Sequence, residues 1–178
     1  MLDQRVGQIL GMNPTLTLEY GMIWQPFTYM FVHGGTGHIL FNMLVLFVFG
    51  HYLERALGSI EFMLLYFGVG ILAGLFSLWI YVAAGTINVF LVGASGAIYG
   101  AVFVFAVLNP RAMLYIFGLI PISARVLVLL YTAINLLNQL GGAQTGVAHM
   151  THLAGFGFAA LYCALRLRIN PVKRLLHG

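Results

Sequence analysis

Five long apolar stretches occupy most of this chain and constrain its fold more than any other feature. Of its 178 residues, 61% are hydrophobic and 7% are charged, whereas a soluble domain has about 45–50% apolar and about 25% charged residues. This composition excludes a soluble enzyme, a disordered tail and a nucleic-acid-binding protein, which needs a dense basic surface. Since a membrane span needs about 20 mostly apolar residues, we expect one all-α, polytopic membrane bundle of about five helices in a lipid bilayer.

The expected membrane core covers residues 37–168. Its five spans lie at roughly 37–54, 60–84, 95–109, 122–138 and 149–167. Residues 1–36 combine Pro and Gly breakers with aromatic side chains, which suits a segment lying in the external interface. Residues 169–178 are expected to form a cytoplasmic basic tail. A single cysteine, Cys163, excludes an internal disulfide and a cysteine-cluster metal site.

Basic residues set the expected orientation of the bundle. Alternating the spans places seven of the eight basic residues on one side: Arg55, Arg111, Arg125, Arg166, Arg168, Lys173 and Arg174. By the positive-inside rule this side is cytoplasmic, so the C-terminus is cytoplasmic and the N-terminus external. Because residues 1–11 show no signal-peptide apolar region, we expect that a preceding span is missing from the chain. A true five-span protein with a short translocated N-terminus is the alternative.

Polar residues inside the spans fall at one depth. Asn42, Ser95 and His152 each lie 13 to 15 residues from the cytoplasmic end of their spans, which is about 20–22 Å along a helix. In a hydrocarbon core about 30 Å thick, that level is roughly 10 Å below the external surface. Polar side chains at such depths are costly and usually functional. His38 shares a helix face with Asn42 and lies one turn higher.

The third span is too short to cross the bilayer by itself. Residues 88–94 (NVFLVGA) must therefore enter the membrane as non-helical backbone. Such backbone is tolerated only where it is buried in protein or lines a wet cavity. We therefore expect a water-filled pocket that opens outward, with Ser95 at its floor.

The surroundings of Ser95 suit nucleophilic catalysis. Gly93 and Gly96 flank the serine at the start of a helix, where free N–H groups can stabilise an oxyanion. His152 can accept the serine proton. No Asp or Glu lies at this depth, so the expected catalyst is a Ser–His dyad without the carboxylate of a triad.

Three further side chains complete the expected site. Tyr99 follows Ser95 by four residues on the same helix face and is expected to pack on the His152 imidazole. His38 and Asn42 are natural side-chain donors to the oxyanion. Small residues on both spans, Gly96 and Gly100 on one and Gly155 and Ala159 on the other, would allow the helices to approach closely.

Each of these signals also has a simpler interpretation. A GxSG sequence is common in membrane helices, a buried histidine is often structural, and an intramembrane asparagine can join helices by about 1 kcal/mol per hydrogen bond. Zinc ligation by His38, His149 and His152 is a further alternative, although no carboxylate or thiolate joins them. Their common depth favours the joint catalytic interpretation.

With these motifs the chain resembles the rhomboid intramembrane serine proteases. The resemblance runs from Trp24 to about Arg168. It rests on four segments in order: residues 24–28 (WQPFT) with His33, 38–42 (HILFN), 93–96 (GASG) with Tyr99, and 148–155 (AHMTHLAG). The family core has six spans, and the first is absent here.

The resemblance implies the roles of the site residues. Ser95 would be the nucleophile, His152 the general base, and the Ser95 N–H, His38 and Asn42 the oxyanion hole, with Tyr99, Gly93 and Gly96 in support. It implies cleavage of transmembrane protein substrates near the external ends of their membrane segments, with no metal or cofactor.

Three functions follow from the sequence, in order of preference. The first is an intramembrane serine endopeptidase, the second an inactive rhomboid-like binder of membrane proteins, and the third a small-solute channel or transporter. A channel needs polar residues at many depths along its pore, whereas the polar residues inside these spans lie at one depth. The span at 122–138 contains no glycine, so we expect it to pack loosely and to move when a substrate helix enters.

Overall fold

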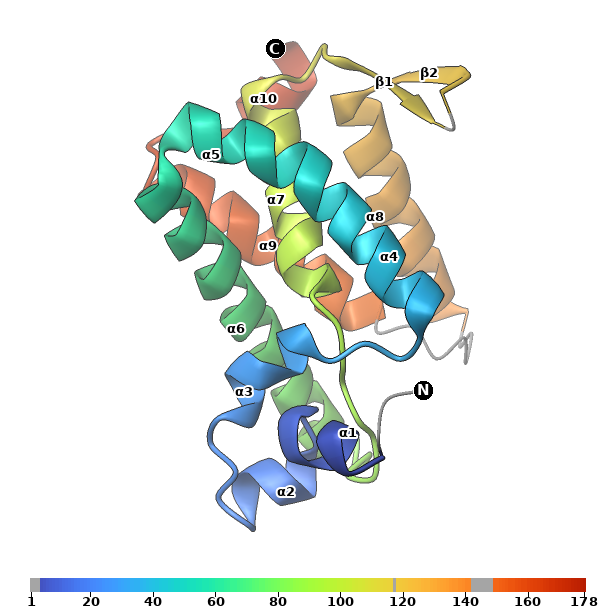
Figure 1. The fold of residues 1–178 in the computed structure, drawn as a ribbon. Helices are drawn as coiled ribbons and strands as arrows, with labels where there is room; N and C mark the ends of the chain where they lie inside the picture. Colours follow the sequence, from blue (N-terminus) through green and yellow to red (C-terminus); the bar gives the residue numbers. More distant parts are fainter. Residues whose placement is uncertain (1–3, 117, 142–148) are drawn as a thin grey trace.

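The computed structural model describes residues 4–116, 118–141 and 149–178, and the chain is mostly helical (Figure 1). The long helical segments are α4 (Thr36–Val45), the π-helical turn η2 (Leu46–Gly50), α5 (His51–Leu57), α6 (Ser59–Ala83), α7 (Ser95–Leu108), α8 (Ala124–Leu140) and α9 (His149–Leu165). The short ones are α1 (Gln4–Leu10), α2 (Pro14–Leu18), α3 (Gln25–Thr28), η1 (Tyr29–Phe31) and α10 (Pro171–His177). By length and composition, Thr36–Leu57 and Ser59–Ala83 can each cross a membrane, and α7 and α8 are shorter apolar helices.

Helix α7 lies at the centre of the bundle and packs against α6, α8 and α9 (Figure 1). Ten of its residues are buried, including Gly96 and Gly100. A Cβ on Gly155 of α9 would collide with the carbonyl oxygen of Gly96, and a Cβ on Gly100 would lie 2.6 Å from Val69 of α6. Small residues thus let three helix backbones approach closely, as membrane helices require.

Residues before α4 dock on α6 through two buried side chains. The Tyr29 ring fits against Gly74, and its hydroxyl donates to the Gly70 carbonyl at 2.7 Å. Met30 packs on Gly70. The segment expected to lie in the interface is therefore an ordered set of short helices attached to α6.

The N-terminal segment also satisfies the non-helical backbone that precedes Ser95. Asn13 donates its side-chain amide to the carbonyls of Ile87 and Val89, at 3.1 and 2.9 Å. Met12 and Leu91 exchange two backbone hydrogen bonds. The buried polar backbone is thus paired inside the protein, which is the condition for irregular structure at membrane depth.

Two features at the end of the bundle that carries Arg111 and Arg166 were not predicted from the sequence. A hairpin of β1 (Met113–Ile116) and β2 (Ile120–Ser123) pairs Met113 with Ser123 and connects α7 to α8. Most of the expected basic tail forms α10, whose Leu175 is buried. Arg166 donates two hydrogen bonds to the Glu61 carboxylate, and this contact raises the pKa of the Arg166 guanidinium.

The contact of α7 with α9 makes a prediction about stability. Gly155→Ala places a methyl group against the Gly96 carbonyl, and overpacking of this kind costs about 1–3 kcal/mol. We expect a lower midpoint of thermal unfolding in detergent, followed by circular dichroism. Gly157→Ala, two residues further on, adds a methyl group to open space and should leave the midpoint unchanged or raise it. Equal midpoints for the two variants would contradict the close approach.

Candidate active site

Ser95 and His152 meet where α7 and α9 cross. Ser95 is the first residue of α7 and His152 lies in the first turn of α9. The Ser95 Oγ is 2.8 Å from the His152 Nε2, a normal hydrogen-bond distance. Ser95 is half-buried, whereas the His152 side chain is 7% exposed. Gly96 is the residue after Ser95, and Gly155 lies three residues after His152. The contact between these two glycines therefore brings the Ser95 and His152 side chains together.

Gly93 shapes the backbone that leads into Ser95. Its φ angle is +114°, a region that side chains other than glycine rarely adopt. A Cβ there would lie 2.8 Å from Cε1 of His38. The Gly93 N–H donates to the Tyr29 carbonyl at 2.9 Å, so the docked N-terminal segment fixes this turn.

Tyr99 stacks on the imidazole of His152, as the sequence analysis expected. The ring centroids are 4.1 Å apart and the planes differ by 8°. The ring of Phe156, one turn after His152 in α9, also packs on Tyr99 with the centroids 5.2 Å apart. The stack holds the plane of the imidazole and shields one face from solvent.

Asn135 of α8 is the residue that the sequence analysis missed. Its Oδ1 lies 3.1 Å from His152 Nδ1 and 3.0 Å from His149 Nδ1. Its Nδ2 donates to the Tyr131 carbonyl at 2.9 Å. The predicted dyad therefore has a third polar group, which contacts the imidazole nitrogen that does not face Ser95. The signal was present, since Asn135 is an amide in the interior of a mostly apolar span.

His38 and Asn42 lie near the serine loop without a direct bond to Ser95 among the described contacts. The Gly34 N–H points at Nδ1 of His38 at 3.3 Å, so the neutral ring carries its proton on Nε2. That nitrogen faces Gly93. Asn42 is 4% exposed, and its amide donates to the His38 carbonyl at 2.8 Å.

His33 lies behind this pair and has no predicted chemical role. It is buried, and its ring packs edge-on against His38 at 5.1 Å. Burial, together with the neighbouring His38, lowers the pKa of His33, which favours its neutral form near pH 7.

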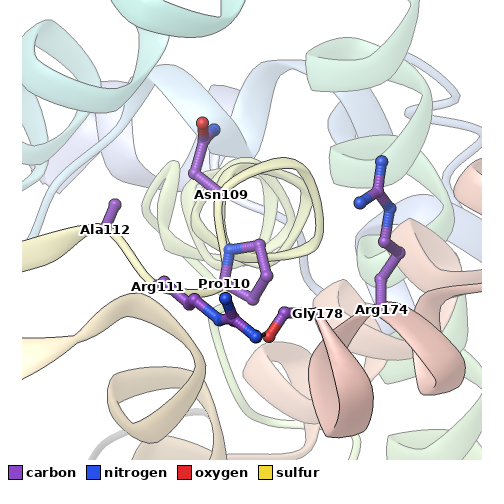
Figure 2. A pocket seen from close by; sticks show the side chains of 6 residues that line it. All are labelled: Asn109, Pro110, Arg111, Ala112, Arg174 and Gly178. Carbon is purple, nitrogen blue, oxygen red and sulfur yellow. Dashed lines mark hydrogen bonds between the residues drawn. The ribbon is translucent and has the colours of Figure 1, made fainter.

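Other parts of the described chain offer no competing chemistry. Across residues 4–116, 118–141 and 149–178, no three His, Cys, Asp or Glu side chains form a group that could hold a metal ion. A pocket of about 380 Å³ lies at the far end of α7 from Ser95 (Figure 2). It is lined by Asn109, Pro110, Arg111, Ala112, Arg174 and Gly178. This lining contains two arginines and no serine, cysteine or histidine.

The described chain combines a membrane-type helical bundle with a serine–histidine pair at the N-terminus of its central helix, α7. These two features together are typical of one class of membrane protein. Comparison with known families agrees, because residues 20–169 match the model of the rhomboid domain. The chain belongs to the rhomboid family, and it is a multi-pass membrane protein with a helical fold. The family and the fold class predicted from the sequence are confirmed.

Three curated relatives illustrate the extent of the similarity. YdcA from Bacillus subtilis is 40% identical over 102 residues, which are 56% of this chain and 48% of the relative. Rhomboid protease GlpG from Haemophilus influenzae is 28% identical over 85% of this chain and 74% of the relative. Rhomboid protease AarA from Providencia stuartii is 31% identical over 90% of this chain and 62% of the relative. The chain thus spans about half to three quarters of these proteins.

The stack of Tyr99 on His152 makes a prediction about the reactivity of Ser95. Aromatic pairs contribute about 0.5–1.5 kcal/mol beyond burial, so Tyr99→Leu should slow labelling of Ser95 by a fluorophosphonate about 2- to 13-fold. Tyr99→Phe keeps the ring and should stay within about twofold of the unmodified protein. The measurement is the rate of probe incorporation in detergent. Equal rates for the Leu and Phe variants would show that the stack does not support the imidazole.

Proposed function

We propose that this protein is an intramembrane serine endopeptidase that cleaves transmembrane segments of other membrane proteins. The observation that carries the proposal is the 2.8 Å contact between Ser95 Oγ and His152 Nε2 at the start of α7. Membership of the rhomboid family supports it, because relatives of this chain are named rhomboid proteases.

The geometry supports a two-step acyl transfer. His152 Nε2 takes the hydroxyl proton as Ser95 Oγ attacks the scissile carbonyl, and the C–N bond breaks when the resulting imidazolium protonates the leaving amine. A water molecule then attacks the acyl-enzyme with His152 again as the base. The peptide bond is hydrolysed with no change of oxidation state, so the proposed reaction needs no cofactor.

The oxyanion formed in each step needs donors near Ser95. The Ser95 N–H is at the start of α7, where backbone N–H groups have no partner within the helix. The Nε2–H of His38 faces the loop that carries Gly93. Asn42 is close to His38 and retains a second amide hydrogen. Each donor of this kind contributes about 10²–10³-fold in known enzymes.

The proposed orientation follows from the basic residues. The end of the bundle with Arg111, Arg166 and α10 would face the cytoplasm, and the site at the start of α7 would open to the external side of the cell membrane. Substrates would enter from the bilayer as transmembrane helices and be cut near their external ends, at small residues in helix-destabilising sequence.

Replacement of Ser95 tests the proposal most simply. Ser95→Ala and His152→Ala should each lower cleavage of a generic transmembrane substrate in detergent at least about 1,000-fold, because nucleophile and base act as a unit. Ser59→Ala is the matched control. The Ser59 hydroxyl bonds Glu54 at the opposite end of the bundle, so its removal should leave the rate unchanged. The readout is product formation by gel or mass spectrometry.

Two outcomes would contradict the proposal. Equal cleavage by the unmodified protein and Ser95→Ala would exclude a serine mechanism. A folded protein that binds transmembrane segments but neither cleaves them nor reacts with a fluorophosphonate would be an inactive rhomboid-like binder instead.

A further inference from the structure

We propose that Asn135 is a positioning residue that holds His152 in its reactive tautomer and thereby ties the reactivity of Ser95 to the position of α8. The inference rests on the proposed protease function and adds a third residue to the site. Asn135 contributes its side-chain amide from α8, a helix that supplies neither the nucleophile nor the base.

One backbone carbonyl determines which way the Asn135 amide points. The Tyr131 carbonyl oxygen can only accept a hydrogen bond, so the Asn135 atom 2.9 Å from it is the NH₂ group. The amide oxygen must then face His149 and His152. Because that oxygen can only accept, each imidazole donates an Nδ1–H to it, at 3.0 and 3.1 Å.

The tautomer of His152 follows from this bond. A neutral imidazole carries one proton, and a proton on Nδ1 leaves Nε2 as an acceptor. Nε2 is the atom 2.8 Å from Ser95 Oγ. In the opposite tautomer Nε2 would carry the proton and could not take one from the serine. In serine proteases a carboxylate provides this orientation, and here the amide oxygen occupies that place.

The Asn135 side chain also anchors the outer half of α8. Ala124, Leu127 and Val128 are the buried apolar residues at the start of the helix. From Tyr131 to Leu140, Asn135 is the one buried side chain, with 3% exposure. Leu136, Leu137 and Leu140 are exposed. Hydrogen bonds from two histidines of α9 to Asn135, together with the packing of the Tyr131 ring on Tyr99, therefore hold this half of α8 against the bundle.

This arrangement couples the helix to the catalyst. A movement of the outer half of α8 by an ångström or two stretches the bond to His152 Nδ1 beyond hydrogen-bond range. A substrate that displaces α8 would leave His152 free to change tautomer until the helix returns. Ser95 would then be fully activated only when α8 is packed against the bundle and Asn135 bonds His152.

The groups that act on His152 come from four helices. Ser95 and Tyr99 belong to α7, His149 to α9, Asn135 to α8 and His38 to α4. The described carboxylates lie elsewhere: Glu54 and Glu61 are at the far end of the bundle, and Glu19 follows α2. Among the described residues, therefore, the amide oxygen is the acceptor on the Nδ1 side of His152.

Two substitutions of Asn135 separate positioning from structure. Asn135→Leu keeps the volume and removes the acceptor, and it should lower kcat about 10- to 100-fold, the cost typical of losing an orienting partner of an imidazole, with KM changed less than about threefold. Asn135→Asp keeps an acceptor for His152. It should retain kcat within about tenfold, and the low-pH limb of the rate should move to higher pH, because a carboxylate stabilises the imidazolium.

Thr132→Val is the matched control on the same helix. The Thr132 hydroxyl donates to the Val128 carbonyl, four residues earlier. Asn135 makes the equivalent bond to the Tyr131 carbonyl. Its loss should leave kcat, KM and the pH profile unchanged. Thermal unfolding of each variant in detergent reports whether it is folded.

The outcomes distinguish this inference from the proposed function. If the unmodified protein cleaves and folded Asn135→Leu cleaves with kcat within threefold of it, Asn135 does not position His152, although the protease function stands. If Asn135→Leu does not fold, the Asp variant decides, because a low-pH limb that stays in place would show that residue 135 does not contact the His152 imidazole and would overturn the inference. If the unmodified protein does not cleave, both proposals are overturned.

Discussion

The close approach of α7 and α9 at Gly96 and Gly155 is the contact on which the candidate site depends. It sets the distance between two helices that each contribute one polar side chain, and side chains larger than glycine would separate them. Ser95 and His152 then fall within hydrogen-bond distance because each lies next to this contact in its own helix. Packing, rather than a polar attraction, thus brings the pair together.

Several polar groups around Ser95 are paired by the protein itself. The backbone before Ser95 is satisfied by Asn13, Met12 and Tyr29 from the docked N-terminal segment. The histidines are satisfied by Asn135 from α8. In a bilayer an unpaired polar group costs several kcal/mol, so these bonds lower the cost of a polar site inside the bundle.

Much of the fold could be predicted because it depends on local sequence. Apolar length predicted five segments whose bounds lie close to those of observed helices, and Ser95 begins α7 as expected. The common depth of Ser95 and His152 required only the rise of a helix. Their 2.8 Å separation in the structure agrees with that argument, while their catalytic roles stay a proposal.

The residues that were not predicted depend on tertiary contacts. Whether an asparagine in α8 faces lipid or a histidine of α9 is decided by the rotation and crossing of the two helices, which hydrophobicity does not encode. The third group of a triad is usually a carboxylate, and Asn135 is an amide, so the triad pattern does not single it out. The docking of Tyr29 into α6 likewise depends on Gly70 and Gly74, more than 40 residues further along the chain.

The central claim is that His152 activates Ser95 and no other serine. The chain has four serines, at positions 59, 77, 95 and 123, so peptide mapping by mass spectrometry can locate a fluorophosphonate adduct without ambiguity. We expect a single adduct on the peptide that contains Ser95 in the folded protein, and its loss in His152→Ala. An adduct on another serine, or equal labelling of Ser95 in the absence of His152, would contradict the account.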